Sequence, residues 1–355
     1  MPLARDVGVV SAASEVQASG SDSVRAVLVD APAAEPRLGT VVLPRRTAGT
    51  TLVAVAAAPL NPLDLLIASG AFHSVRHEAP YVPGSECVGV VLESDAHAPG
   101  SWVYAECHAA PGTPGAFADR VLVADADVLP LPHGIDPVLA AAVGNAGTAA
   151  YLPLVEIAGL RRGESVLVLG ATGAVGQLAV QIARLVGAGR VIGVGRDHAA
   201  LQRVLDLGAD AIVALQPGES RDDLAARLRA AAGPVNVVLD GIYGLPLEAA
   251  LQVCAPRARL INIGNLAGPT AQVPAGSMRG KQLVLSGFAG LHVSLRDKQP
   301  ALSWLWAEIS RGGLQLATRV FPLDELPAAW RAQSDSPHAK CVIVPDARLS
   351  TGDRA

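Results

Sequence analysis

A run of closely spaced small residues is the first feature of this sequence that could take part in chemistry. Ala171, Gly173 and Gly176 follow the apolar run Ser165–Leu169 and precede a helical pattern. This order gives the A-x-G-x-x-G form of the dinucleotide fingerprint. The first small residue allows a sharp turn, Gly173 lets the backbone approach a pyrophosphate, and Gly176 lets the helix pack closely on the strand. We therefore expect the phosphates of a dinucleotide to rest on the free N–H groups at the start of the helix.

A glycine turn also occurs for packing reasons alone, but here a second apolar strand, Arg190–Val194, completes a βαβ unit. The complete unit favours dinucleotide binding over packing. The remaining residues of the turn that we expect to contact the cofactor are Gly170, Thr172, Ala174 and Val175.

The end of the second strand indicates which dinucleotide is bound. An NAD-selective site has a carboxylate there, whereas this chain has Gly195 followed by Arg196. A small residue leaves room for a 2′-phosphate, and a guanidinium can grip it. Asp197 is the counter-argument, but it lies beyond the strand tip, where it is placed to cap a helix that opens at His198. NADPH is thus the expected cofactor.

Strands and helices continue to alternate as far as the run Leu283–Gly287, which predicts an α/β fold with a doubly wound parallel Rossmann sheet. Ligands of such sheets bind at the carboxyl ends of the strands. Asp240, Gly264 and Asn265 end two further strands, so we expect them to line the same cleft as the glycine turn.

The N-terminal part is different, because short strand-like runs from Val24 to Val123 are separated by proline and glycine turns. The strand-like run His338–Val344 is expected to return to this β-rich part. The predicted organisation is a flexible extension (1–23), a β-rich catalytic domain (24–145 and 290–355) and a dinucleotide-binding domain (146–289).

Composition narrows the function classes. The formal net charge is −4 and no basic cluster with interleaved aromatics is present, so nucleic acid is not an expected partner. Four scattered cysteines without a C-x-x-C pair are typical of a reduced cytosolic protein. No uninterrupted apolar run could cross a bilayer, and no basic segment followed by an apolar run opens the chain. We expect a cytoplasmic protein that acts on a small molecule and does not bind membranes.

Six segments in the same order resemble the medium-chain dehydrogenase/reductase superfamily, specifically its zinc-independent quinone oxidoreductase branch. Besides the fingerprint they are Asn61–Asp64, Val82–Glu86, Gly115–Asp119, Gly147–Tyr151 and Leu207–Asp210. The resemblance covers nearly all of Val24–Val344. It implies a GroES-like catalytic domain beside the Rossmann domain.

The resemblance also bears on metal use. Zinc-dependent relatives have a Cys near the position of Asn61 and a His where this chain has Ser85. Neither an amide nor a hydroxyl is a good zinc ligand, so the expected site is metal-free. Without a Lewis acid, alcohol oxidation is difficult, whereas hydride delivery to a quinone or an α,β-unsaturated carbonyl needs positioning and a donor near the carbonyl oxygen.

Matching motifs suggests individual roles. Thr148 resembles a threonine that lies against the nicotinamide, although a helix-start cap would use the same residue. Lys340 matches a lysine that the family often has after a glycine, here replaced by Ala339, and the match makes Lys340 a candidate cofactor-binding residue. Asn61 is the candidate donor to the substrate carbonyl, with a turn residue as the alternative. Tyr151 is a candidate proton donor, with a packing role as the alternative.

The substrate pocket is expected to be apolar, because Leu66 and Phe72 stand where several quinone reductases have tyrosines. Two alternatives to a quinone or enone reductase remain open: an enoyl or polyketide-type alkene reductase, and an NADPH-binding sensor without turnover. The edge strand expected at Leu283–Gly287 makes a homodimer plausible.

Overall fold

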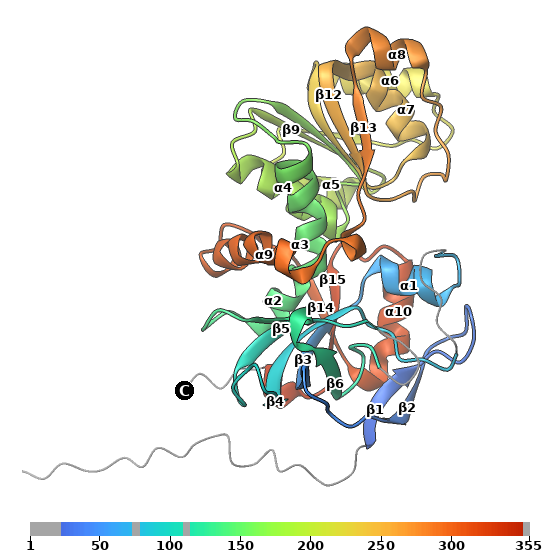
Figure 1. Cartoon of the computed structure of the whole chain (residues 1–355). Coiled ribbons are helices and arrows are strands. Elements are labelled where there is room, and N and C mark those ends of the chain that lie inside the picture. The colour runs from blue at the N-terminus through green and yellow to red at the C-terminus, as the bar shows by residue number, and fades with distance from the viewer. Residues whose placement is uncertain (1–22, 73–78, 109–113, 351–355) are drawn as a thin grey trace, which may run out of the picture.

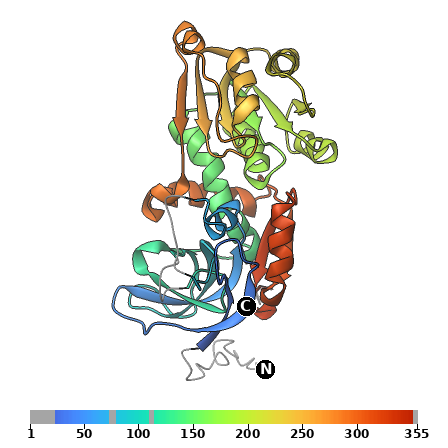
Figure 2. The ribbon, with the colours of Figure 1, turned by 90° about the vertical axis from the view of Figure 1, so that its right-hand side faces the viewer.

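The computed structural model describes residues 23–72, 79–108 and 114–350. The predicted flexible extension therefore lies outside the described residues, except for Ser23, which begins the first strand. Two lobes are stacked along the long axis of the molecule, and each is built around a β-sheet (Figure 1). A view from the side shows that helix α3 passes between them (Figure 2).

The first lobe is built on a six-stranded parallel sheet, in the order β10-β9-β8-β11-β12-β13. Its strands are β8 (Ser165–Leu169), β9 (Arg190–Gly195), β10 (Ala211–Ala214), β11 (Val235–Asp240), β12 (Cys254–Asn262) and β13 (Val284–Gly287). Its helices are α4 (Ala174–Leu185), α5 (His198–Asp206), α6 (Arg221–Ala232), α7 (Gly244–Val253) and α8 (Ala275–Lys281). The predicted doubly wound Rossmann sheet is confirmed.

Strand β8 is apolar on both sides because each of its faces lies in a hydrophobic core. Val166 and Val168 belong to a core that also contains residues of α3 and α4. Leu167 and Leu169 belong to a second core, with residues of α6 and α7. Successive side chains of a strand point to opposite faces, so a strand covered on both faces is a continuous apolar run.

The second lobe contains a seven-stranded sheet, in which β14-β15-β3-β4-β5-β7 are neighbours and β6 pairs with β3, and a separate pair β1-β2. The strands are β1 (Ser23–Leu28), β2 (Arg37–Val42), β3 (Thr50–Pro59), β4 (Glu86–Glu93), β5 (Trp102–Glu106), β6 (Arg120–Ala124), β7 (Val128–Pro130), β14 (Thr318–Pro322) and β15 (Lys340–Val344). Strand β15 pairs antiparallel with β3, so the C-terminal strand returns to the β-rich lobe as predicted.

The helices of this lobe are α1 (Pro62–Ala68), α2 (Pro137–Ala142), α9 (Leu295–Ser310), α10 (Leu326–Ser334) and the short α11 (Ala347–Ser350). Single-turn 3₁₀ segments lie at Asp125–Asp127, Gly290–His292 and Leu323–Glu325. The amphipathic pattern of the sequence predicts a helix over Pro300–Gly312, but α9 begins five residues earlier, because Ser294 caps it by accepting the N–H of Asp297.

Helix α3 (Gly144–Tyr151) connects the lobes and continues into a wider-wound π-helical segment, Leu152–Ile157. Pro153 lies in that segment and has no N–H to donate to the preceding turn, which disturbs the α-helical ladder there. A side chain at Gly147 would place its Cβ 2.7 Å from Leu305 of α9, so glycine is required where α3 and α9 touch. The domain boundary expected at residues 145/146 falls inside α3.

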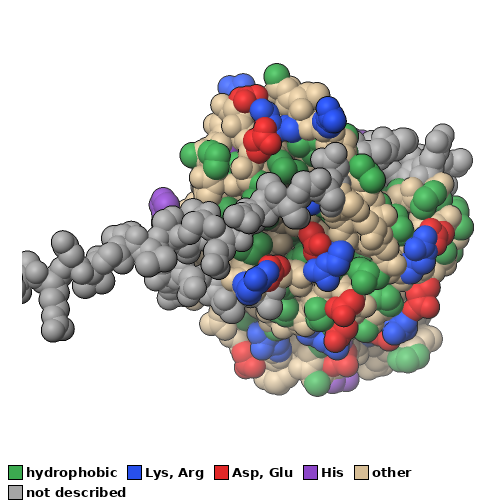
Figure 3. All heavy atoms as spheres, turned by 90° about the horizontal axis from the view of Figure 1, so that it is seen from below, with side chains coloured by type: hydrophobic (Ala, Val, Ile, Leu, Met, Phe, Trp, Pro, Cys, Tyr) green, Lys and Arg blue, Asp and Glu red, His purple; other side chains and the backbone are tan. Residues whose placement is uncertain are grey.

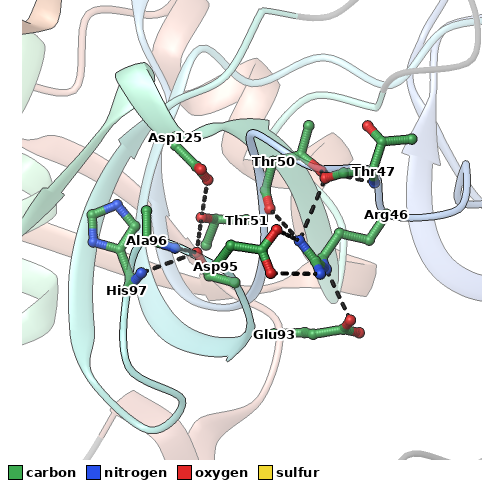
Figure 4. A network of polar contacts seen from close by, with 10 residues as sticks. Arg46, Thr47, Thr50, Thr51, Glu93, Asp95, Ala96, His97 and Asp125 are labelled. Atoms are coloured by element: carbon green, nitrogen blue, oxygen red, sulfur yellow. Dashed lines mark hydrogen bonds and ion pairs between the residues drawn. The ribbon is translucent and has the colours of Figure 1, made fainter.

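A network of polar contacts lies at the end of the β-lobe that is farther from the other lobe. Arg46 is paired with Glu93 and Asp95, and the hydroxyl of Thr51 donates to Asp125 over 2.6 Å (Figure 4). On the face seen from below, acidic and basic side chains are interspersed (Figure 3). In the described ranges, none of the helices is long and apolar enough to span a membrane.

Candidate active site

The glycine turn between β8 and α4 has the geometry of a phosphate cradle. The left-handed turn falls on Gly170, with φ +86°, and not on Ala171 as the fingerprint suggested. A Cβ on Gly176 would lie 2.3 Å from the carbonyl oxygen of Gly170, so this glycine sets how closely α4 packs on the turn. A Cβ on Gly173 would meet nothing nearer than 3.7 Å, so the start of α4 is open to a ligand.

The tip of β9 lies against this turn. A Cβ on Gly195 would be 2.7 Å from Cγ2 of Thr172, so any larger residue there would displace the Thr172 side chain. Arg196 follows as an exposed side chain. Asp197 accepts the N–H of Ala200 over 2.7 Å and caps α5, as the sequence suggested. Its carboxylate is therefore engaged by the helix start.

The carboxyl ends of β11 and β12 lie beside the end of β8, where the glycine turn begins. Oδ1 of Asp240 accepts the backbone N–H groups of Ile242 and Tyr243, and its Oδ2 accepts from Nδ2 of Asn262 over 2.9 Å. A Cβ on Gly264 would lie 2.5 Å from the carbonyl oxygen of Gly241. Asp240 thus shapes the strand ends through bonds within the protein. Asn265, which follows Gly264, is exposed.

A contact between the lobes crosses the glycine turn, and the sequence did not predict it. Nε2 of Gln177 on α4 donates to the carbonyl oxygens of both Thr172 and His338, each over 2.8 Å. Nδ1 of His338 lies 3.3 Å from the carbonyl oxygen of Thr172. The segment that precedes β15 is therefore fastened to the cradle.

Thr148 and Tyr151 both lie on α3. The hydroxyl of Thr148 donates to the carbonyl oxygens of Gly144 and Asn145, each over 3.1 Å, inside the helix. The alternative interpretation as a helix-start cap is therefore wrong, because a residue in mid-helix bonds back to the preceding turn. The ring of Tyr151 packs on that of Trp304, with the centroids 5.0 Å apart. This contact fits the packing role that the sequence left open for Tyr151.

A buried polar cluster lies where α1, β4 and β15 meet. Asn61, only 3% exposed, caps α1, and its Nδ2 donates to Oε1 of Glu86 over 2.9 Å. Longer contacts of 3.3 Å join the same Nδ2 to Ser85 Oγ and to the carbonyl oxygen of Pro59. Nζ of Lys340 donates to Oδ1 of Asn61. Both ends of the Asn61 amide are thus engaged inside the protein, and its role as a donor to a substrate stays a prediction.

Glu86 connects this cluster to α3. Its Oε2 accepts the hydroxyl of Tyr104 and the backbone N–H of Asn145, each over 2.7 Å. Glu86 is 1% exposed. Burial, followed by the charge of Glu86, raises the pKa of Tyr104 well above its ordinary value. The first turn of α3, one turn before Thr148, is therefore held by a carboxylate of the β-lobe.

Asp64 is the other buried carboxyl of the cluster. It accepts the backbone N–H of Asn61 over 2.7 Å, and the side chain of Ser85 hydrogen-bonds to it as well. Burial raises the pKa of Asp64 to about 7, against the opposing effects of its hydrogen bond from Asn61 and the charge of Lys340. Burial also lowers the pKa of Lys340. At neutral pH the Asp64 carboxyl therefore carries its proton in a large part of the molecules.

A small cavity of about 40 Å³ opens beside Asp64, lined also by Ser85, Tyr81, Ile67 and Cys107. Ile67 is the apolar residue that α1 contributes to the lining. The expected lining residue Leu66 is 40% exposed, and Phe72, beyond the end of α1, is half-buried. Tyr81 also lines the cavity, although the sequence led us to expect an apolar pocket.

Known proteins share both lobes of this structure. The family model "Zinc-binding dehydrogenase" matches residues 174–307, and "Alcohol dehydrogenase GroES-like domain" matches residues 47–133. Quinone oxidoreductase of Sus scrofa is 27% identical over 84% of this chain and 89% of its own length. The chain belongs to the medium-chain dehydrogenase/reductase superfamily, in its quinone oxidoreductase branch.

Two further comparisons extend this placement among the medium-chain oxidoreductases. A phenolphthiocerol/phthiocerol polyketide synthase of Mycobacterium tuberculosis is 30% identical over 82% of this chain, which spans 13% of the length of that synthase. The solved structure of mycobacterial Rv1454c complexed with NADPH superposes with a TM-score of 0.79 at 22% identity, over 91% of this chain and all of that one. The second likeness shows the shared fold.

The name of the first family model raises the question of zinc. At the two positions where zinc-dependent relatives have a Cys and a His, this chain has the amide of Asn61 and the hydroxyl of Ser85, which are poor zinc ligands. The ammonium group of Lys340 occupies the space beside the Asn61 oxygen. Within the described ranges, no three His, Cys, Asp or Glu side chains gather into a metal site. These two positions therefore do not supply the thiolate and imidazole ligands of a catalytic zinc ion.

Proposed function

We propose that this medium-chain reductase is an NADPH-dependent, metal-free oxidoreductase that delivers hydride to a quinone or an α,β-unsaturated carbonyl. The observation that carries the proposal is the chemistry of the buried cluster. A zinc-dependent enzyme needs thiolate and imidazole ligands at this place. Here the place is taken by the amide of Asn61, which is hydrogen-bonded to Lys340 and Glu86. Such a site cannot lower the pKa of an alcohol by coordination, so an acceptor that is already electron-poor is the better substrate.

The cradle fits the phosphates of a dinucleotide, because the N–H groups at the start of α4 are free of side-chain bulk at Gly173. Gly195 and Arg196 favour the 2′-phosphate of NADPH, since Asp197 is engaged as a cap. When bound, NADPH supplies the hydride. Thr148 would lie against the nicotinamide, and the strand ends at Gly264 and Asn265 would border it.

Residues of this chain position the acceptor and stabilise the negative charge that forms on it. Hydride addition leaves negative charge on the oxygen of the acceptor, which donors at the site can stabilise. Lys340 places a positive charge behind the amide of Asn61, and Ser85 and Tyr81 line the cavity. The half-buried Phe72 adds apolar surface beyond the end of α1.

An acceptor screen tests the proposal. The purified protein is mixed with NADPH and a panel of quinones and enones, and NADPH oxidation is followed by its absorbance. We expect oxidation with at least one acceptor and no loss of activity after treatment with a chelator. Enhanced NADPH fluorescence on mixing, without oxidation by any acceptor, would favour a coenzyme-binding sensor.

A second candidate is an alkene reductase of a biosynthetic pathway, which the likeness to the polyketide synthase favours. The same residues would serve it. Enoyl thioesters in the acceptor panel separate the two, because a biosynthetic reductase should prefer the thioester to a free quinone in kcat/KM.

A further inference from the structure

The charged groups of α1, β4 and β5 and the two lysines that face them do not balance. Three carboxyl groups, those of Asp64, Glu86 and Glu106, lie among two ammonium groups, those of Lys340 and Lys298. Lys298 is paired with Glu106 over 2.6 Å. Buried charge that has no counter-charge is costly, so one of the carboxyls retains a proton.

The hydrogen bonds indicate which carboxyl it is. Glu86 receives three donors, from the Asn61 amide, the Tyr104 hydroxyl and the Asn145 N–H, so both of its oxygens already accept hydrogen bonds and neither is free to carry a proton. Asp64 receives one backbone N–H at 2.7 Å, shares a hydrogen bond with the side chain of Ser85, and lines the cavity. Asp64 therefore keeps the proton, and of the two it is the carboxyl beside the opening.

The groups that face Asp64 come from several elements. Lys340 of β15 lowers its pKa and Glu86 of β4 raises it. Tyr81 and Cys107 line the same cavity. Burial, followed by the charge of Asp64, raises the pKa of Tyr81 to about 12. A hydrogen bond with Cys87, followed by burial, raises the pKa of Cys107 well above its ordinary value. Both neighbours therefore stay protonated at neutral pH. Helix α10 also packs against α1, but its Arg331 pairs with Glu35 at the exposed surface.

We propose that Asp64 and Ser85 form a proton relay that protonates the acceptor after hydride addition. The Ser85 O–H bond breaks as an O–H or C–H bond forms on the anionic acceptor, and the Asp64 O–H bond breaks as its proton passes to Ser85 Oγ. Asp64 is left as a carboxylate that accepts the Asn61 N–H and faces Lys340. Water at the mouth of the cavity then returns the proton. This inference rests on the proposed reductase function.

The test compares Asp64→Asn with wild type. Asparagine has the same shape and can still accept the Asn61 N–H, so the fold is retained, but it has no proton to give. We expect kcat with an enone to fall by roughly 10- to 100-fold, with unchanged NADPH affinity by fluorescence. In wild type, kcat should decline as the pH rises through about 7, and this decline should disappear in the variant.

A second pair of variants tests the hydroxyl. Ser85→Ala should reduce kcat as Asp64→Asn does, whereas Ser85→Thr, which keeps a hydroxyl, should restore most of it. Asp125→Asn, in the network at the other end of the β-lobe (Figure 4), is the matched control and should leave kcat and its pH profile unchanged.

Infrared spectroscopy gives a readout that does not depend on turnover. The carbonyl band of a protonated carboxylic acid should be present in wild type at pH 6, weaken as the pH rises through about 7, and be absent from Asp64→Asn. If wild type turns over and Asp64→Asn retains its kcat and pH profile, the relay is wrong and the reductase stands. If wild type oxidises NADPH with none of the acceptors, the reductase function and the relay fail together.

Discussion

Nζ of Lys340 donates a hydrogen bond to Oδ1 of Asn61, although the two residues are 279 positions apart in the chain. This hydrogen bond completes the buried cluster. It can form because β15 returns to pair with the end of β3, just before Asn61. It also gives Lys340 a role different from cofactor binding, which was the expectation from sequence. The first prediction distinguishes the two.

Replacing Lys340 by Met removes the donor and leaves the buried oxygen of Asn61 without its partner. An unsatisfied buried polar group costs about 1–3 kcal/mol, so urea denaturation should show a loss of that size. The dissociation constant for NADPH should change less than twofold. A large loss of NADPH affinity with unchanged stability would instead support cofactor binding by Lys340.

Replacing Arg196 by Ala should weaken NADPH much more than NADH, because only NADPH has a 2′-phosphate. A charge-assisted hydrogen bond is worth about 1.5–3 kcal/mol, which corresponds to a loss of roughly 10- to 100-fold in NADPH affinity. Fluorescence titration with both coenzymes measures it, and Arg203→Ala on α5 serves as the control. Equal losses for NADPH and NADH would show that Arg196 does not bind the 2′-phosphate.

Two glycines of the cradle should respond differently to alanine. At Gly176 the new Cβ would lie 2.3 Å from the Gly170 oxygen, so α4 must shift, and both thermal stability and NADPH binding should fall. At Gly173 the nearest atom would be 3.7 Å away, so Gly173→Ala should melt near the wild-type temperature yet bind NADPH more weakly. Normal coenzyme affinity in Gly173→Ala would show that the phosphates lie elsewhere.

Stability should depend on pH through Asp64. Burial raises its pKa in the folded protein from 3.8 to about 7, so between these values the native state binds more protons than the unfolded state. Stability from this group is therefore greatest at low pH and falls as the pH rises towards 7, by up to ~4 kcal/mol. Urea denaturation between pH 5 and pH 8 should show this decline in wild type and a flatter profile in Asp64→Asn. Parallel profiles would exclude Asp64 as the titrating group.

Strand β13 is an edge strand of the Rossmann sheet, and Val284 on it is 53% exposed. An uncovered edge can pair with a second copy of itself, so we expect a homodimer in light scattering. Val284→Lys should shift the population towards monomer, whereas Val320→Lys, equally exposed on β14 of the other lobe, should not. A monomeric wild type would exclude this prediction.

Much of the fold could be predicted from local sequence because its causes are local. The apolar run Ser165–Leu169, the glycine turn and the amphipathic helix after it form β8 and α4 as expected. Helix α9 was placed too far along the chain, because a proline usually opens a helix, whereas here Pro300 lies inside one that Ser294 caps. The capping serine was a signal that could have been used.

The site was less predictable than the fold. Asn61, Ser85 and Glu86 were visible as motif residues, but their meeting with Lys340, Tyr104 and Asn145 depends on how the strands are ordered in space. The protonation of Asp64 follows from burial and from the sum of surrounding charges, which no local pattern contains. The contact of His338 with the cradle arises between lobes in the same way.

The link between Glu86 and the N–H of Asn145 fixes one end of α3 to the β-lobe, while Leu154 and Ala158, at its far end, belong to the same core as residues of β8. A helix anchored at both ends transmits rotation without absorbing it. If the lobes close over a coenzyme, the hinge must therefore be the π-helical segment around Pro153. Pro153 would then limit how far the two lobes can rotate relative to each other.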